Sequence, residues 1–262
     1  MPTSSNVVEA SLPNYYRSLA PFRARFAQGN PILIYHKLGP RPRRVRLKGL
    51  YVGANLFAAQ LGELQAAGFG NGSLQHSAGP FQPGKIVISF DDGYVNVLRQ
   101  AVAPLAAAGF KAIQFLPANF LGRQNEWDVA HGEAPEAIMD AAQVREWLAA
   151  GHDLGSHSLT HPFLTQVPLE QARKEIFASK KKLEDLFGRP IEHFCYPHGD
   201  WNEPVRDFVR EAGYRTACTT VAGVNDASTS PFALKRFTVR YRSRNWKGLK
   251  AWLAERWAAR SR

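Results

Sequence analysis

Two adjacent carboxylates, Asp91 and Asp92, are the residues best suited to chemistry in this sequence. They follow the apolar run Ile86-Val87-Ile88 within the segment ISFDDGYVN. Adjacent carboxylates repel each other, and neither packs well in an apolar core. An ordinary Asp-Gly turn is one interpretation. The apolar run before the pair makes a functional site at the end of a buried strand the better one.

Two histidines, His157 and His161, stand four residues apart in the segment SHSLTH. If this segment is helical, both imidazoles point to one side. Two neutral imidazoles and one carboxylate bind a divalent metal and leave positions open for water and substrate, as in catalytic sites. Asp91 or Asp92 can supply the carboxylate. The alternative is that one histidine caps a helix and the other is exposed.

A metal next to a free carboxylate is an arrangement suited to hydrolysis. The metal lowers the pKa of its bound water towards neutrality, and the free carboxylate then accepts the water's proton as a general base. Gly93, directly after the two acids, allows the backbone to approach a ligand closely. The residue types therefore predict a metal-dependent hydrolytic site.

Strand-like and helix-like segments alternate along the chain, and this alternation must position these residues. The predicted strands are 31–36, 85–90, 111–117, 152–157, 191–197, 214–221 and 233–241. The predicted helices are 56–70, 95–110, 140–151 (with Asp140 as N-cap), 168–188, 202–213 and 245–260. The pattern favours a parallel α/β architecture, either a (β/α) barrel or a doubly wound sheet.

Polar residues follow the predicted strands at His36, Asp91-Asp92, His157 and 196–199. Both candidate folds place functional residues at the carboxyl ends of their strands. We therefore expect these residues to form one cluster.

The segments SFDDG, SHSLTH and FCYPHG, in this order, resemble the motifs of the NodB-homology polysaccharide deacetylases, carbohydrate esterase family 4. The segments ILIYHKL, GLYVGANLFAAQLGELQAAGF and NDASTSPFALKRFTV extend the likeness over residues 31–240. The resemblance is nearest to the "YH" members that act on poly-N-acetylglucosamine. It implies a TIM-like fold, a distorted (β/α)7 barrel, with one divalent metal. Zinc is the first choice, with cobalt, manganese, nickel or iron as alternatives.

The resemblance also implies roles for individual residues. Asp91 corresponds to the general base, and the metal ligands correspond to Asp92, His157 and His161. The backbone N–H of His198 lies where the family has an oxyanion donor, so His198 counts among the catalytic residues. The residues expected at the substrate are Tyr196, Pro197, Gly199 and Arg236.

The sequence departs from the family pattern in two places. Many members have an arginine at the position of Cys195 that orients the base; Arg236 is its candidate replacement, and a surface arginine is the alternative. Many members also have a late histidine as general acid, but no histidine follows His198 here. His36, in the "YH" segment, is the candidate acid. The alternative is a strand-end histidine bonded to backbone.

Composition limits the remaining function classes. The 262 residues carry a net charge of +11. A solvated basic surface is the first interpretation and an anionic partner is the alternative; no nucleic-acid-binding motif accompanies the charge. The two cysteines favour free thiols over a disulfide framework. No apolar run is long enough for a membrane span. No signal-like start is seen, so the cytoplasm is the expected location, with export and peripheral membrane association left open.

The sequence thus predicts an N-terminal extension at 1–30 and one catalytic domain at 31–262. The expected function is metal-dependent hydrolysis of C–N bonds other than peptide bonds, removing N-acetyl or O-acetyl groups from a glycan or glycoconjugate. The alternatives are a deformylase or other C–N hydrolase on this fold, a degenerate barrel that only binds glycans, and a nucleic-acid binder. The sequence leaves the oligomeric state open.

Overall fold

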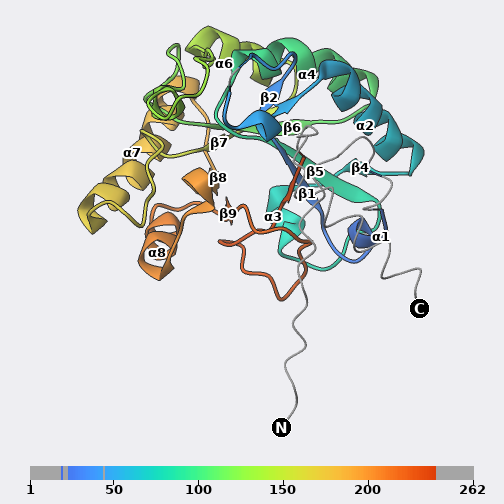
Figure 1. The fold of residues 1–262 in the computed structure, drawn as a ribbon. Helices are drawn as coiled ribbons and strands as arrows, with labels where there is room; N and C mark the ends of the chain where they lie inside the picture. The colour runs from blue at the N-terminus through green and yellow to red at the C-terminus, as the bar shows by residue number, and fades with distance from the viewer. Residues whose placement is uncertain (1–18, 20–22, 44, 240–262) are drawn as a thin grey trace, which may run out of the picture.

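A curled, fully parallel sheet forms the centre of the computed structural model, which describes residues 19, 23–43 and 45–239 (Figure 1). The strands follow one another in the order β10-β1-β5-β6-β7-β8-β9. Their bounds are β1 Ile32–Tyr35, β5 Lys85–Phe90, β6 Ala112–Leu116, β7 Asp153–Ser156, β8 His193–Cys195, β9 Thr216–Cys218 and β10 Phe237–Thr238.

One chain segment near the C-terminal end of the described residues links the two ends of this strand order. Leu234 forms a parallel bridge with Cys218 of β9, and β10, three residues later, pairs with β1. The amide of Val239 then donates to the carbonyl of Ile34. The strands therefore enclose an interior, and the predicted distorted (β/α)7 barrel is confirmed.

Five longer helices flank the sheet (Figure 1). They are α2 Ala54–Ala66, α4 Val95–Ala107, α6 Ala141–Ala149, α7 Leu169–Phe187 and α8 Glu203–Glu211. Asp140 caps α6 as predicted, in a reciprocal capping box with Gln143. α7 ends at Gly188, whose φ of 63° is left-handed. The predicted helix 245–260 lies outside the described residues.

Several short elements were not predicted from the sequence. They are the strands β2 Lys37–Leu38, β3 Tyr51–Val52 and β4 Gly70–Asn71, the helices α1 Arg23–Phe26, α3 Leu74–Ser77 and α5 Glu126–Val129, and the 3₁₀ turns Lys48–Leu50 and Pro197–Gly199. β2 pairs with β3, and β4 pairs with the start of β5. Such short segments take their conformation from tertiary pairing rather than from local periodicity.

Alternation along the strands divides the buried side chains into two sets. The larger core lies between the sheet and the helices, while a second cluster contains Ile32, Val87, Ile113, Phe115, Cys195, Cys218 and Leu234. Because successive strand residues point to opposite faces, this second set fills the barrel interior. The inward positions that follow Val87 are Ser89 and Asp91, and the one that follows Leu234 is Arg236. The interior is therefore apolar at its floor and polar towards the carboxyl ends of the strands.

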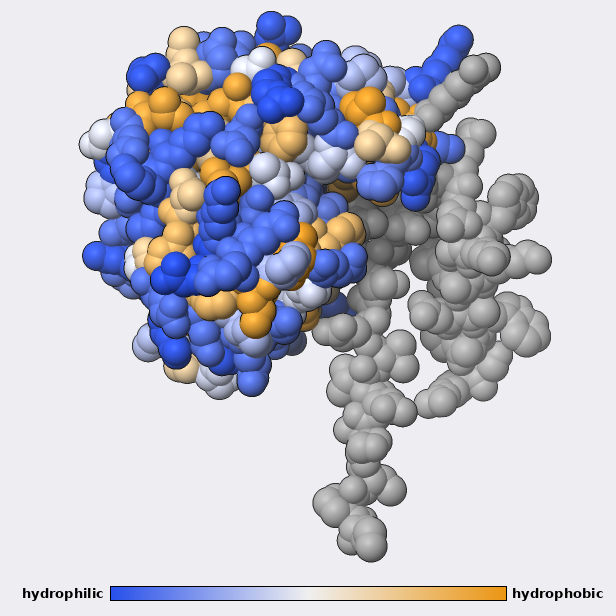
Figure 2. Space-filling view, turned by 90° about the vertical axis from the view of Figure 1, so that its left-hand side faces the viewer, coloured by the Kyte–Doolittle hydropathy of each residue, from blue (hydrophilic) through white to orange (hydrophobic). Residues whose placement is uncertain are grey.

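The outer surface over α7 is mostly hydrophilic with scattered apolar residues (Figure 2). The sequence spacing places Leu169, Ala172, Ile176, Leu183 and Leu186 on one face of this helix, but Leu169 and Leu186 are exposed, while Ala172, Ile176 and Leu183 are buried. Leu169 begins α7 and Leu186 lies in its last turn, so both extend beyond the part that packs on the sheet. In the described part of the chain, no helix has the length and apolar character needed to cross a bilayer.

Candidate metal and catalytic site

Asp92, His157 and His161 converge at the carboxyl ends of β5 and β7. The Nε2 atoms of His157 and His161 lie 3.4 and 3.3 Å from Oδ1 of Asp92. None of the three residues is more than 5 % exposed. Their ligand atoms form one of two groups of metal-ligating type among the described residues. Two imidazole nitrogens and a carboxylate oxygen facing one point form the donor set expected for a divalent metal.

The two histidines are not on a helical turn, so that expectation was wrong. His157 follows β7 directly, and the chain then passes through Ser158 and His161 with φ values of 64° and 61°. Left-handed residues cannot continue a right-handed helix. The Ser158 hydroxyl accepts a hydrogen bond from the amide of His161 at 3.0 Å. A compact loop, rather than helical periodicity, brings the two imidazoles together.

Hydrogen bonding leaves His157 ready to bind a metal through Nε2. Its Nδ1 lies 2.7 Å from the backbone carbonyl of Cys195, and because a carbonyl only accepts, Nδ1 carries the proton. A metal-binding histidine commonly makes such a second hydrogen bond. Burial alone would raise the pKa of Asp92, but hydrogen bonds from His157 and His161 hold it well below its ordinary value. Burial would lower the pKa of His157, but Cys195 and Asp92 hold it well above.

Asp91 lies beside this group and is paired with Arg236. The guanidinium donates two hydrogen bonds, each 2.8 Å long, to the two carboxylate oxygens. Its Nε donates to the carbonyl of Thr219 at 2.9 Å and its Nη1 to the Ser89 hydroxyl at 3.2 Å. Burial alone would raise the pKa of Asp91, but the charge and hydrogen bonds of Arg236 outweigh it and lower that pKa. Asp91 is therefore an ionised, oriented carboxylate.

The position of Arg236 differs from two of the sequence-based interpretations. Its side chain is fully buried, so it is not a surface arginine, and its donors are directed at Asp91 and the barrel interior rather than at an exposed substrate face. It contacts the carboxylate that the missing family arginine was expected to contact. Arg236, 145 positions after Asp91, thus makes the contact for which the sequence suggested it as a replacement.

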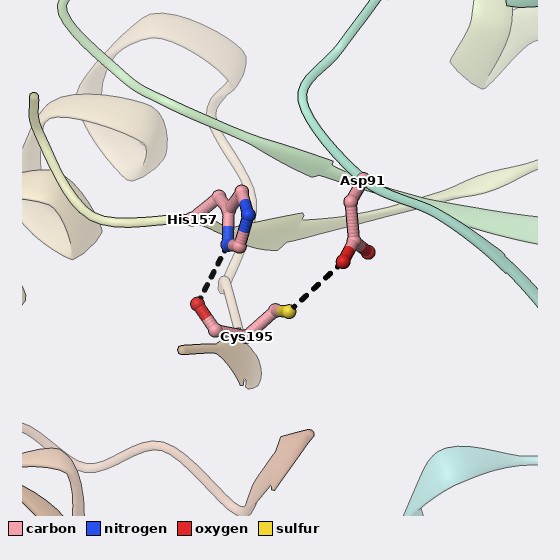
Figure 3. Close-up of side chains that lie close together, drawn as sticks. All are labelled: Asp91, His157 and Cys195. Atoms are coloured by element: carbon pink, nitrogen blue, oxygen red, sulfur yellow. Dashed lines mark hydrogen bonds between the residues drawn. The ribbon is translucent and has the colours of Figure 1, made fainter. Parts of the chain in front are cut away.

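Cys195 connects the carboxylate and the histidine (Figure 3). Its Sγ lies 3.4 Å from Oδ2 of Asp91 and 3.0 Å from Nη2 of Arg236. Burial raises the pKa of this thiol to about 11, so the neutral S–H donates to Asp91 while the sulfur accepts from Arg236. Asp91, His157 and Cys195 form the second group of metal-ligating type. The guanidinium contacting two of them disfavours a cation there, which leaves the Asp92 group as the metal site.

His36 follows β1 and is half-buried near both carboxylates. Its Nδ1 is buried and has no hydrogen-bond partner within the described residues, so the backbone-bonded alternative is not seen at this atom. Burial lowers the pKa of His36, although Asp92 and Asp91 act in the opposite direction. An unpartnered imidazole nitrogen next to two carboxylates is available for a water molecule or a substrate.

The segment 196–199 forms a tight turn after β8. His198 and Gly199 have φ values of 59° and 71°, and a Cβ on Gly199 would lie 2.1 Å from the Thr220 hydroxyl oxygen. The exposed His198 ring stacks on Phe163 at 3.8 Å. Tyr196 is fully buried, with its hydroxyl donating to the carbonyl of Phe232. Its side chain therefore faces the core and not a substrate, unlike the sequence-based expectation.

Trp127 of α5 contacts a candidate metal ligand, and the sequence did not identify it as a site residue. Its ring stacks on His161, with centroids 4.5 Å apart, and packs edge-on against Phe120. Its Nε1 is buried without a hydrogen-bond partner in the described part of the chain. The stretch NEWD has no periodicity that points to the metal ligands, so only the tertiary position of α5 shows this contact.

Comparison with known proteins places this site in a family. A family model described as "Polysaccharide deacetylase" matches residues 78–217. YxkH of Bacillus subtilis, which is named for the same family, is 26% identical over 154 residues, or 59% of this chain and 51% of that protein. The chitooligosaccharide deacetylase of Azorhizobium caulinodans is 32% identical over 72 residues, or 27% of this chain and 34% of that one. The chain thus spans about half or less of these relatives.

Solved structures agree at the level of the fold. IcaB from Ammonifex degensii has a TM-score of 0.71 at 22% identity, covering 86% of this chain and 96% of that one. The deacetylase PplD of Streptococcus pyogenes, solved with acetate, has a TM-score of 0.69 at 21% identity, covering 84% and 96%. At this identity the likeness establishes the shared barrel.

Proposed function

Because this chain belongs to the polysaccharide deacetylase family, we propose that it is a metal-dependent hydrolase that removes N-acetyl groups from a glycan or glycoconjugate. The observation that carries the proposal is the convergence of Asp92, His157 and His161 beside an Asp91 carboxylate held by Arg236. One divalent ion, zinc in the first instance, fits these three ligands. Such an ion lowers the pKa of a bound water and polarises a carbonyl oxygen.

The side chains around the ligands supply the remaining steps. Asp91 takes a proton from the attacking water while the oxygen of that water adds to the carbonyl carbon of the acetyl group. Arg236 and Cys195 keep Asp91 ionised and oriented. The backbone N–H of His198 donates to the oxygen that becomes negatively charged. His36 donates a proton to the nitrogen as the C–N bond breaks, and the charges of Asp92 and Asp91 favour the protonated imidazole that this step requires. The products are acetate and a free amine.

The candidate general acid favours N-acetyl over O-acetyl groups as the natural substrate. An amine leaves a tetrahedral intermediate only after it gains a proton, so an unpartnered imidazole such as His36 near the base suits this reaction. An acetyl ester depends less on such an acid. Loss of His36 should therefore reduce turnover of N-acetyl substrates more than turnover of O-acetyl substrates.

The testing experiment combines metal content with acetate release. Elemental analysis of the purified wild type should find about one zinc or similar ion per chain, and His157→Ala should lose it. The wild type should release acetate from one or more members of a panel of N-acetylated glycans. Asp91→Asn should retain the metal and lose turnover by at least about 100-fold.

Each of these measurements has its own result that would contradict the proposal. A wild type without metal after reconstitution would contradict the metal site. A metal-loaded wild type without activity on the panel would favour a barrel that only binds glycans, and release of formate instead would favour a deformylase. An Asp91→Asn variant with near-wild-type turnover would contradict the base assignment.

A further inference from the structure

The loop that carries His161 is held in a conformation that it would not adopt on its own. Two of its residues, Ser158 and His161, are left-handed without being glycine, which costs about 1–3 kcal/mol each. Such a conformation persists only where surrounding groups fix it. Because the relative position of His157 and His161 depends on it, the groups that fix the loop also determine the metal geometry.

The loop is held from two sides. Towards β6, the amides of Ala118 and Asn119 donate to the carbonyls of Ser158 and Leu159, both at 3.0 Å. From α7, Glu175 also reaches the loop. These contacts come from neighbouring elements and bracket the residues between the two histidines.

Glu175 makes three hydrogen bonds to this short loop. Its Oε2 accepts from the amides of Leu159 and Thr160 at 2.9 and 2.8 Å, and its Oε1 accepts from the Thr160 hydroxyl at 2.6 Å. The side chain is only 5 % exposed and lies on the buried face of α7, between Ala172 and Ile176. An acidic residue on an apolar helix face is the sequence signal for such a role, and it was missed. Buried carboxylates are kept where hydrogen bonds compensate for their lost hydration.

We propose that Glu175 is a positioning residue that sets the metal affinity of the site by fixing the loop between His157 and His161 through hydrogen bonds. The inference rests on the proposed metal-dependent function. It attributes the effect on metal affinity to the length of the side chain, which places the oxygens at the two amides. It does not attribute the effect to the negative charge of the carboxylate. Glu175 does not contact Asp92, His157 or His161 through any of these three bonds, so it acts through the backbone of Leu159 and Thr160.

Two variants of Glu175 separate the effect of side-chain length from the effect of negative charge. In Glu175→Gln, a carbonyl oxygen at the place of Oε2 can keep both amide bonds, and the NH₂ group can donate to the Thr160 hydroxyl oxygen. Glu175→Asp keeps the charge but is shorter by one methylene, about 1.5 Å, and withdraws the oxygens from both amides. Both variants retain a polar group on α7, so both are suited to folding.

The measurement is the affinity of each full-length, metal-free protein for Zn²⁺ alone, by competition with a chromophoric chelator. We expect Glu175→Gln to bind Zn²⁺ within about threefold of the wild type and Glu175→Asp to bind about 10- to 100-fold more weakly. Ile176→Val, one residue along the same helix, is the control for general stability. It should lower the melting temperature and leave Zn²⁺ affinity unchanged.

The outcomes separate this inference from the proposed function. If the wild type binds no Zn²⁺, the proposed function fails and this inference fails with it. If the wild type binds and Glu175→Asp binds equally well, only the inference is overturned. The inference is also overturned if Glu175→Gln binds Zn²⁺ weakly while Glu175→Asp binds it as well as the wild type. The negative charge, and not the length of the side chain, would then determine the affinity. Equal weakening in both variants, or a matching loss in Ile176→Val, overturns it as well.

Discussion

At the scale of single residues, Asp91 and Arg236 determine each other's state. A buried carboxylate without a partner would be protonated near neutral pH, and a buried guanidinium without a partner would be strongly unfavourable. Together they form a two-pronged pair of charge-assisted hydrogen bonds. Asp91 is thereby ionised at the pH at which a general base must act, and its orientation is fixed before substrate binds.

Arg236→Met should therefore move the pH dependence of the reaction. Without the guanidinium, burial raises the pKa of Asp91, so the base becomes protonated at higher pH. We expect the acidic limb of kcat/KM to shift upward by about 1–3 pH units. Arg210→Met on the exposed face of α8 is the control and should leave the limb in place. An unshifted limb in Arg236→Met would show that Asp91 is not the group that titrates.

The same variant should lose stability in a pH-dependent way. In the wild type the lowered pKa of Asp91 contributes stability that is present above the ordinary pKa of about 3.9 and lost as pH falls through the folded-state pKa. Removing Arg236 leaves a buried charge unpaired, at a cost of about 3–5 kcal/mol near neutral pH. Urea unfolding at pH 7 and pH 4 should show a smaller difference from the wild type at pH 4. An equal stability difference at pH 7 and at pH 4 would show that the loss is not coupled to the ionisation of Asp91.

Zinc binding should release a proton from His157. Cys195 and Asp92 raise the pKa of His157 and so favour the protonated imidazole in the metal-free protein, and a metal competes with that proton. Below this pKa, Zn²⁺ affinity should rise about tenfold per pH unit. Calorimetry in buffers of different ionisation enthalpy should find about one proton released per ion at pH 7. Affinity that stays constant from pH 6 to pH 8 would contradict this coupling.

At the scale of elements, the predictable parts are those with their own periodicity or cap. The strand from Ile32 and the helix capped by Asp140 follow from local sequence. The loop between His157 and His161 does not, because its left-handed residues are not glycines and its partners lie in the turn after β6 and on α7. The contacts of Trp127 were not predictable for the same reason, because they depend on where α5 packs. Arg236 was predicted as the arginine that orients Asp91, and the two side chains are paired. The candidate ligand set could be proposed from the sequence because the order of the motifs identified its residues, and the structure brings these residues together.

Gly199 gives a test at this scale, because the turn after β8 has no room for a side chain. Gly199→Ala introduces both left-handed strain and a contact with Thr220, for an expected loss of about 2–4 kcal/mol. Gly188→Ala, at the end of α7, has a similar φ of 63° and nothing within 4 Å of the new Cβ. It should lose about 1 kcal/mol. Urea unfolding of both variants measures the loss in free energy of unfolding. Equal losses in the two variants would show that the contact with Thr220 contributes nothing.

At the scale of the whole molecule, the proposed metal site would link strands that are distant in sequence. Asp92 follows β5 and His157 follows β7, with β6 between them in the sheet. A ligand that binds only the folded state stabilises it by about 2.7 kcal/mol at 100 times its Kd. For a chain of this size, such an amount corresponds to about 5–11 °C in melting temperature. Chelation should lower the melting temperature of the wild type by this amount.

Asp92→Asn provides the control for that measurement. The variant lacks one ligand charge, so its melting temperature should respond little to added zinc or to chelator. An equal response in the wild type and in Asp92→Asn would show that zinc stabilises the protein from another site. The comparison does not require a known substrate and can therefore precede any activity screen.

The closing segment from Leu234 to Val239 has a consequence for biosynthesis. Chains emerge from the ribosome N-terminal end first, and Asp91 is made 145 residues before Arg236. During that interval β1 and β9 each lack a neighbour, and the future base has no cation beside it. A nascent chain halted before Arg236 would expose two unpaired strand edges, which are sites of aggregation. Synthesis of the segment from Leu234 to Val239 therefore completes both the barrel and the charge balance around Asp91, so the protein is expected to become competent only once that segment has left the ribosome.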